Sequence, residues 1–326
     1  MKIPPPGKEG FFILPTMYLK NIPISELQYP PHLQKQWTVF HQKDFLELYV
    51  PYIRIVGIFN QNDELIGLFY YFKKSKWGIP YIIPPPFFPH NGLLFYSQAE
   101  KTEKKYSQVK ELHQHIIHYF SISEKAYYIC FVLPTKHIDT QIFQWNKWKV
   151  KVHYTYHLDL NLSEAELFEN LSSEKRKSIR KAEKDGIQIS PTSDYSTVYE
   201  LVLKTFQRQN KKINTLYLEK ILKHWKNTDN HFAFVAYKNN KPIATSFCVF
   251  DNNTAYYLLG GYDDAHAHHG AGVSCMWQSI VKSKQMGLSV FDFEGSMLPS
   301  VEHYFRDFGG MLVPYYVCEK KNFRII

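Results

Sequence analysis

The feature that most constrains the fold of this chain is an internal repeat of one pattern of strands and helices. Residues 52–72 (YIRIVGIFNQNDELIGLFYYF) and residues 231–250 (HFAFVAYKNNKPIATSFCVF) each contain two apolar runs of strand length around a polar turn. In each copy, further strand-like sequence, a helical pattern and another strand follow. A pattern that occurs twice predicts two copies of one mixed α/β unit.

The helices and strands that complete the repeat occur in the same order in both copies. Helical patterns cover about residues 103–120 and 272–286, and strand-like sequence follows each of them at residues 126–134 and 288–299. In the later helix, apolar residues recur from Val273 at the spacing of one buried face. With 326 residues, about twice the usual domain length, we expect an α/β fold with mixed sheets and two domains, residues 1–151 and 152–326.

Charge and composition limit the classes of partner and the compartment. The 39 basic and 30 acidic residues give a net charge of +9, which favours anionic partners. The sequence starts with MKIPPPGKEG and contains no apolar run of membrane-spanning length, so we expect a cytoplasmic protein without a transmembrane segment. Its four cysteines form no C-x-x-C pair, and neither a zinc site nor a disulfide framework is expected.

The stretch SVFDFEGSMLP, residues 289–299, combines an apolar and an acidic face. Because side chains alternate along a strand, Phe291 and Phe293 should face one side, and Asp292 and Glu294 the other. Paired carboxylates at a strand end can accept a proton from an amine or orient it. Alternatively, one carboxylate caps a turn and the other pairs with Arg306.

A basic segment, residues 163–186, is predicted to be helical. Ser163 and Glu166 fit a capping box and Gly186 fits a helix stop. Within it Arg176 and Arg180 lie four residues apart, on one helix face. They indicate either an anion clamp for phosphate or carboxylate or an ordinary solvated surface.

A loop with glycines precedes the second predicted helix, in the sequence AHAHHGAGV, residues 265–273. Gly270 and Gly272 would leave backbone N–H groups open to a phosphate or an oxyanion, although glycine also serves any tight turn. The three histidines of the loop, His266, His268 and His269, have no further ligands at matching spacing. They favour a flexible solvated loop, and no metal site is expected.

Several segments together resemble a known family. They are YTYHLDL (154–160), KRKSIRKAEKDG (175–186), YYLLGGYD (256–263) and FDFEGSMLPSVEHYFRDFGG (291–310). In order and spacing they resemble the FemAB-like group, peptidoglycan bridge aminoacyltransferase-like members of the acyl-CoA N-acyltransferase (GNAT-like) superfamily. The resemblance implies two tandem GNAT-like domains, with the last strand returning to the first domain.

The resemblance also implies an activity and its donors. Members of the better-known branch transfer an amino acid from aminoacyl-tRNA to a peptidoglycan precursor, and others are presumed N-acyltransferases with different acyl donors. Acyl-CoA or aminoacyl-tRNA is thus the expected donor substrate, and no tightly bound cofactor is expected. The family's loop Q/R-x-x-G-x-G/A aligns with residues 267–272, where Ala267 replaces the Gln or Arg.

The leading hypothesis is an acyl- or aminoacyltransferase that moves an activated acyl group onto an amine acceptor. Candidate catalytic residues are Asp292, Glu294 and Tyr304. Candidate substrate-binding residues, for an anionic or nucleotide-linked substrate, are Arg176, Arg180, Tyr257 and Arg306. Candidate donor-binding residues are Gly270, Ala271 and Gly272. Asp292 and Arg180 should then share one groove.

Two alternatives stay open at this point. One is tRNA-dependent aminoacyl transfer to a peptidoglycan precursor, with tRNA as a partner whose affinity would fall steeply with salt. The other is a non-catalytic protein that uses its basic helix on an anionic partner. The oligomeric state has no signal in the sequence.

Overall fold

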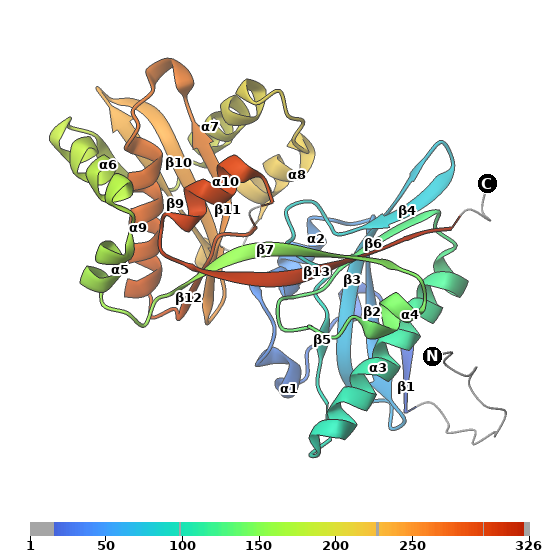
Figure 1. Cartoon of the computed structure of the whole chain (residues 1–326). Helices are drawn as coiled ribbons and strands as arrows, with labels where there is room; N and C mark the ends of the chain where they lie inside the picture. Colours follow the sequence, from blue (N-terminus) through green and yellow to red (C-terminus); the bar gives the residue numbers. More distant parts are fainter. Residues whose placement is uncertain (1–15, 98, 226–227, 296, 323–326) are drawn as a thin grey trace.

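A computed structural model describes residues 16–97, 99–225, 228–295 and 297–322 of the chain. In these ranges thirteen strands form one mixed sheet, which carries helices in both halves of the molecule (Figure 1). The order along the sheet is β1-β2-β3-β4-β6-β13-β7-β12-β11-β10-β9-β8, and β5 pairs with β3. The prediction of an α/β fold with mixed sheets is therefore confirmed.

The first half builds one end of the sheet. Its strands are β1 (Met17–Ile22), β2 (Ile53–Asn60), β3 (Leu65–Lys76), β4 (Ile79–Ile83), β5 (Leu94–Phe95) and β6 (Tyr128–Val132). Its helices are α1 (Pro31–Gln34), α2 (Lys43–Glu47), α3 (Thr102–Tyr119) and α4 (Gln141–Trp145). The predicted hairpin is β2 and β3, and the predicted helix is α3, so this copy of the repeat is present as expected.

The second half builds the other end. Its strands are β7 (Lys149–Asp159), β8 (Gln188–Thr192), β9 (His231–Lys238), β10 (Lys241–Phe250), β11 (Thr254–Tyr262), β12 (Val290–Asp292) and β13 (Met311–Lys321). Its helices are α5 (Glu164–Asn170), α6 (Ser173–Lys184), α7 (Tyr195–Arg208), α8 (Thr215–Glu219), α9 (Ala271–Gln285) and α10 (Pro299–Arg306). The second hairpin, β9 and β10, and the helix α9 match the repeat.

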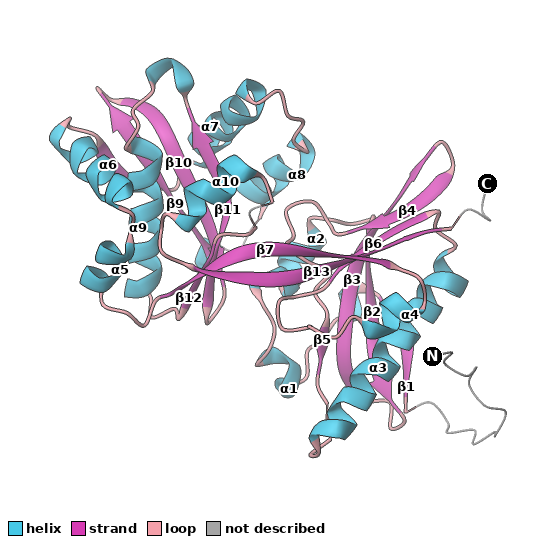
Figure 2. Ribbon diagram, in the orientation of Figure 1, coloured by secondary structure: helices cyan, strands magenta, loops and turns pink. Residues whose placement is uncertain are grey.

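Two long strands, β7 and β13, join the halves (Figure 2). They pair antiparallel from Met311 opposite His157 to Glu319 opposite Lys149. β7 also pairs with β12 of the second half, and β13 also pairs with β6 of the first half. The predicted boundary between residues 151 and 152 falls within β7.

Aromatic packing also joins the halves, because one buried cluster takes residues from both. The rings of Tyr49 and Tyr217 stack with centroids 4.7 Å apart, and those of Phe45 and Trp225 lie 4.7 Å apart. The Trp225 indole also donates a 2.7 Å hydrogen bond to Asp44. Buried aromatic rings and a hydrogen bond therefore hold the two halves together at this contact.

Two predicted elements differ from the observed ones. The basic segment 163–186 is two helices, α5 and α6, because the chain is extended at Leu171 and Ser172. Its capping box at Ser163 and its stop at Gly186, where φ is +74°, are as predicted. Of the described residues in the strand predicted over residues 288–299, only those of β12 form a strand. The backbone turns just after it, at Glu294 and Gly295, where φ is +64° and +106°.

Candidate functional site

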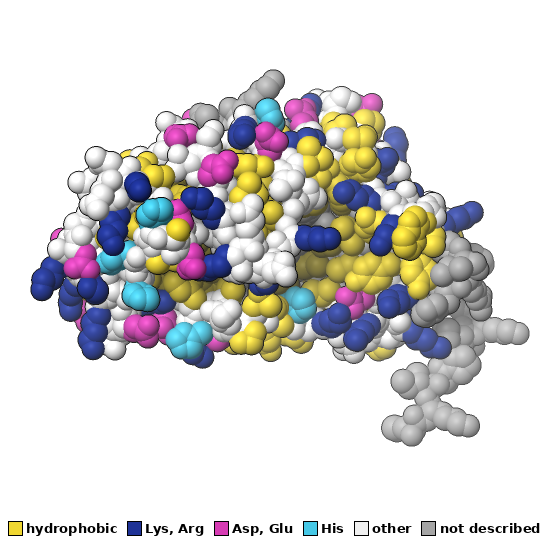
Figure 3. All heavy atoms as spheres, turned by 90° about the horizontal axis from the view of Figure 1, so that it is seen from above, with side chains coloured by type: hydrophobic (Ala, Val, Ile, Leu, Met, Phe, Trp, Pro, Cys, Tyr) yellow, Lys and Arg dark blue, Asp and Glu magenta, His cyan; other side chains and the backbone are white. Residues whose placement is uncertain are grey.

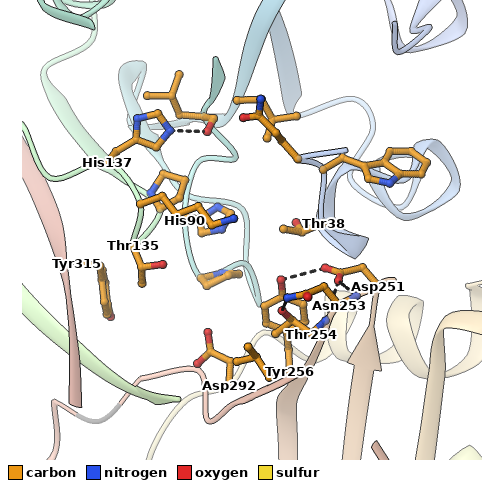
Figure 4. Close-up of a pocket in the computed structure, with 18 of the residues that line it drawn as sticks. Thr38, His90, Thr135, His137, Asp251, Asn253, Thr254, Tyr256, Asp292 and Tyr315 are labelled. Carbon is orange, nitrogen blue, oxygen red and sulfur yellow. Dashed lines mark hydrogen bonds between the residues drawn. The ribbon is translucent and has the colours of Figure 1, made fainter. Parts of the chain in front are cut away.

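A pocket of about 460 Å³ lies between the two halves (Figure 4). The second half supplies residues from β7, the turn before β11, β11, β12 and β13. The first half supplies residues mostly from loops, with His41 from a short 3-10 helix and Leu94 from β5. The polar residues that Figure 4 labels on this lining are Thr38, His90, Thr135, His137, Asp251, Asn253, Thr254, Tyr256, Asp292 and Tyr315. Glu294 also lines it. The two predicted carboxylates therefore share one cavity.

Asp292 is buried at the end of β12 and is held by three hydrogen bonds. Its Oδ1 accepts from the Thr155 hydroxyl at 2.6 Å and from the Glu294 backbone N–H at 2.8 Å. Its Oδ2 lies 3.1 Å from His157 Nε2, which donates to it. The bond to Glu294 N–H makes a short turn of the Asx type. Of the two alternatives for the carboxylates, Asp292 thus caps a turn, and that turn positions Glu294.

Glu294 is the less satisfied of the two carboxylates. Its Oε1 is buried and accepts no hydrogen bond from any residue that the structure describes. Burial, and then the nearby charge of Asp292, raise the pKa of Glu294 well above its ordinary value. A buried polar atom without a partner is unusual in a native protein and points to a ligand or a water at that place.

The opposite wall contains histidines that sequence analysis did not identify. Burial, followed by the charges of His41 and His137, lowers the pKa of His90 to about 3, so its ring is neutral. His90 Nδ1 accepts the Gly92 backbone N–H at 3.0 Å, which places the ring proton on Nε2. Within the described ranges no residue accepts that Nε2–H, so it is a neutral donor at the pocket. Because it comes from a loop of the other half, no local pattern could have revealed it.

His41 and His137 support this wall and are neutral as well. Burial lowers the pKa of each to about 4. Their Nε2 atoms donate to the carbonyls of Gly92 at 3.0 Å and Leu93 at 3.1 Å. Both histidines therefore hold the backbone of the loop that carries His90.

Tyrosines complete the second-half side of the pocket. Tyr256 donates a 3.0 Å hydrogen bond to Asp251, whose pKa is raised by burial. Burial, with the charges of Glu294 and Asp292, raises the pKa of Tyr315 to about 12. Both tyrosines are thus neutral hydroxyls at neutral pH.

The cationic helix α6 does not share this pocket, and the expectation of a single groove for Asp292 and Arg180 is wrong. Phe291 and Phe293 face the core under α9, and α6 packs on the same side of the sheet. Asp292, one residue out of phase with those rings, faces the other side. The alternation of side chains thus separates the carboxylates from α6.

Both arginines of α6 have contacts within their own half. Arg176 donates to the backbone carbonyls of Glu169 and Leu171, which closes the C-terminal end of α5. Arg180 lies over the ring of Phe168, with its guanidinium carbon 5.6 Å from the ring centroid. Their roles as substrate ligands stay predictions without support from the pocket.

Tyr304 and Tyr257 are half-buried on the α9 side, away from the pocket. The ammonium of Lys175 lies 3.9 Å from the centroid of the Tyr304 ring. The Tyr257 ring meets Phe305 edge to face at 5.8 Å. Burial raises the pKa of both tyrosines. The third predicted group in this region, Arg306, pairs with Glu302 at 3.3 Å instead of with a carboxylate of β12.

Of the two glycines at the N-terminus of α9, only Gly270 has a packing role. A Cβ on Gly270 would lie 2.2 Å from the Ser178 carbonyl oxygen, so the glycine allows α6 to approach α9. A Cβ on Gly272 would meet only the Tyr304 hydroxyl, at 3.8 Å. Neither glycine, nor Ala271 between them, lines the pocket. Donor binding at these three residues stays a prediction.

The loop of histidines is more ordered than predicted. His268 is buried, its Nδ1 accepts the Gly270 backbone N–H at 3.1 Å, and its Nε2 donates to Asp185 at 3.0 Å. The expectation of a flexible solvated loop is wrong for His268, because Asp185 at the end of α6 provides a partner from outside the loop.

Comparison with known proteins supports the fold and a broad activity. Residues 170–306 match the sequence model of the acetyltransferase (GNAT) domain, which supports acyl or aminoacyl transfer in general. No curated protein matches the sequence.

Solved structures share the fold over most of the chain. The crystal structure of FemX matches with a TM-score of 0.62 and 13% identity, over 85% of this chain and 91% of FemX. A conserved protein of unknown function from Bacteroides thetaiotaomicron matches with a TM-score of 0.59 and 12% identity, over 93% and 99%. A tandem GNAT protein from the clavulanic acid biosynthesis pathway matches with a TM-score of 0.52 and 8% identity, over 94% and 98%. The chain thus has a tandem GNAT-like fold, with a GNAT acetyltransferase match in its second half and a fold similar to that of FemX.

Proposed function

We propose that this protein transfers an acyl or aminoacyl group to an amine, and that the acceptor amine binds in the pocket beside Glu294. The observation that carries the proposal is the buried Glu294 Oε1, which has no partner in the described part of the chain and lines the pocket. An ammonium group would satisfy that oxygen with a charge-assisted hydrogen bond.

The role proposed for Glu294 is that of a base. An amine is mostly protonated at neutral pH, and it must lose a proton before its lone pair can attack an acyl carbon. In the proposed step the carboxylate of Glu294 takes that proton, and the amine nitrogen forms the new amide bond. The bond from the acyl carbon to the donor's sulfur or ester oxygen breaks, and the released group takes the second proton that the nitrogen loses as the amide forms.

Two features of the pocket suit this role. The raised pKa of Glu294 makes it a stronger base than an exposed carboxylate, and the turn at Asp292 fixes its position. The His90 Nε2–H is a neutral donor for an oxygen of the substrate on the opposite wall. Asp292 is in this proposal a positioning residue.

The donor class is proposed from the domain match and the shared fold, with acyl-CoA first and aminoacyl-tRNA as the alternative. A test compares the full-length chain with Glu294→Gln. Thermal melting would be measured with coenzyme A, longer acyl-CoAs, charged tRNA and nucleotide-linked cell-wall precursors, since a ligand that binds the native state raises Tm. Products formed from each donor with a panel of amines would be identified by mass spectrometry.

We expect an amide product from wild type and a rate lower by roughly 10²–10⁴ in Glu294→Gln, the usual contribution of a general base. Glu302→Gln is the matched control, because that glutamate lies on α10 and pairs with Arg306. Equal rates for wild type and Glu294→Gln would remove Glu294 from the mechanism. Absence of product with every donor would instead favour the non-catalytic alternative.

A further inference from the structure

Lysines are concentrated where the start of β7 and the end of β13 lie beside strands of the first half. Cross-strand pairing aligns Lys74 with Tyr81, Tyr81 with Tyr128, and Tyr128 with Lys321. The start of β7 lies at the same end, because Lys149 pairs with Glu319. Five lysines line an open depression of about 730 Å³ there: Lys147, Lys149, Lys151, Lys320 and Lys321.

The positive charge of this end is only partly compensated. Glu319 pairs with Lys151 at 2.6 Å and also accepts from the Tyr128 hydroxyl. Lys320 donates to backbone carbonyls. Lys147, Lys149 and Lys321 are exposed and have no ion pair with any residue that the structure describes. This surface therefore attracts anions.

An exposed tryptophan lies at the tip of the β3–β4 hairpin, on the same side of the molecule (Figure 1). Trp77 is 88% exposed, in a turn where its φ is +52° and that of Gly78 is +78°. In Figure 1 the hairpin projects from the body of the molecule. The ammonium of Lys76 lies 4.6 Å from the centroid of the indole ring. At the base of the hairpin Tyr52 is 44% exposed, with Lys74 beside its ring.

Figure 3 shows the same end in the space-filling view from above, where dark blue side chains surround yellow ones on the right of the molecule. An aromatic tip among lysines is the pattern of an interfacial anchor. Indole rings favour the level of lipid head groups, and lysines add attraction to an anionic surface.

We propose that this end of the molecule, formed by Trp77 and the lysines Lys76, Lys147, Lys149 and Lys321, docks on an anionic phospholipid surface. Two observations favour a lipid surface over nucleic acid. The unpaired cations are all lysines, which are point charges, whereas phosphate recognition in nucleic acids commonly uses the planar fork of arginine. The exposed indole is at a protruding tip, where it can enter a head-group layer. The inference does not depend on the proposed transfer activity.

The test is co-sedimentation of the full chain with vesicles of phosphatidylcholine mixed with phosphatidylglycerol, and with vesicles of phosphatidylcholine alone. We expect binding to the mixed vesicles at low salt, weaker binding as salt rises, and little binding to phosphatidylcholine alone. Lys149→Glu with Lys321→Glu should lower the partition coefficient by about fivefold or more for each lysine removed. Trp77→Ala should lower it further.

The matched control is Lys177→Glu with Lys184→Glu, which makes the same charge change on exposed lysines of α6. Circular dichroism and thermal melting would verify that each variant is folded. The proposal fails if wild type does not sediment with the mixed vesicles at low salt, or if the α6 pair lowers binding as much as the Lys149 and Lys321 pair. It also fails if these lysines are needed only for binding a tRNA probe.

Discussion

The two faces of β12 show how one short segment serves packing and chemistry at once. On one face Phe291 and, just after the strand, Phe293 are fully buried in the apolar cluster that also includes residues of α9 and α10. On the other face Asp292 and Glu294 line a cavity between the halves. The apolar face fixes the position of the acidic face, because the buried rings of Phe291 and Phe293 hold the backbone that carries Asp292 and Glu294 at the pocket.

The largest expected effect is on the apolar face. The ring of Phe293 lies 5.1 Å from that of Phe291 and 5.2 Å from that of Phe305. Phe293→Ala should lower the free energy of unfolding by about 3–5 kcal/mol, the usual cost of a buried phenylalanine. Chemical denaturation would measure it, with Met297→Ala, a half-exposed neighbour, as the control. If Phe293→Ala lowered the free energy of unfolding no more than Met297→Ala does, the apolar face would not be what holds this segment in place.

The next effect concerns the two glycines of α9. Gly270→Ala should destabilise the protein by about 1–3 kcal/mol, because the added methyl meets the backbone of α6. Gly272→Ala should stabilise it by up to about 1 kcal/mol, since alanine is the better helix former and space is available. Denaturation curves for both variants decide this. If instead Gly272→Ala abolished donor binding without changing stability, the donor-binding prediction for this loop would gain support.

On the acidic face, stability should depend on pH through Glu294. Its pKa is raised in the folded state above the ordinary value of 4.5, so the native state binds the extra proton. Stability from this group is complete below pH 4.5 and is lost as pH rises through the folded pKa. As the pH rises from 4.5 through the folded pKa of Glu294, the free energy of unfolding should therefore fall more in wild type than in Glu294→Gln. Parallel curves would show that Glu294 is not perturbed.

The smallest effect is expected for Arg180, on the α6 surface. Arg180→Ala removes a contact with Phe168 and should cost about 0.5–1 kcal/mol, the value for an exposed cation–π pair. It should leave the rate of acyl transfer unchanged, because α6 does not reach the pocket. A large drop in the rate of transfer, with unchanged stability, would support the prediction that Arg180 binds the substrate.

Local patterns were sufficient for the elements of the fold and for the faces of β12. The two hairpins, the buried stripe of α9 and the alternation of Phe291, Asp292 and Phe293 depend only on neighbours in sequence. The break between α5 and α6 was missed, because both flanks favour helix and the extended residue Leu171 is buried by contacts from distant segments.

The candidate site could be predicted only in its second-half part. Asp292 and Glu294 stand out in the sequence, but His90 comes from a loop whose place depends on how the halves pack. Helical spacing showed that Arg176 and Arg180 share a face, and it could not show which side of the sheet that face would cover. A glycine at position 270 is compatible with a phosphate site and also with the close approach of a neighbouring helix. Only the position of α6 in the folded protein distinguishes the two roles.

The continuous pairing of β7 with β13 has a mechanical consequence. A rotation of one half away from the other would have to bend or twist both strands together, because they are paired over nine residue pairs, from Met311 opposite His157 to Glu319 opposite Lys149. The pairing of β7 with β13 therefore resists a hinge motion between the halves. We expect molecules to enter and leave the cavity by rearrangement of the loops at its rim, while the sheet keeps its shape.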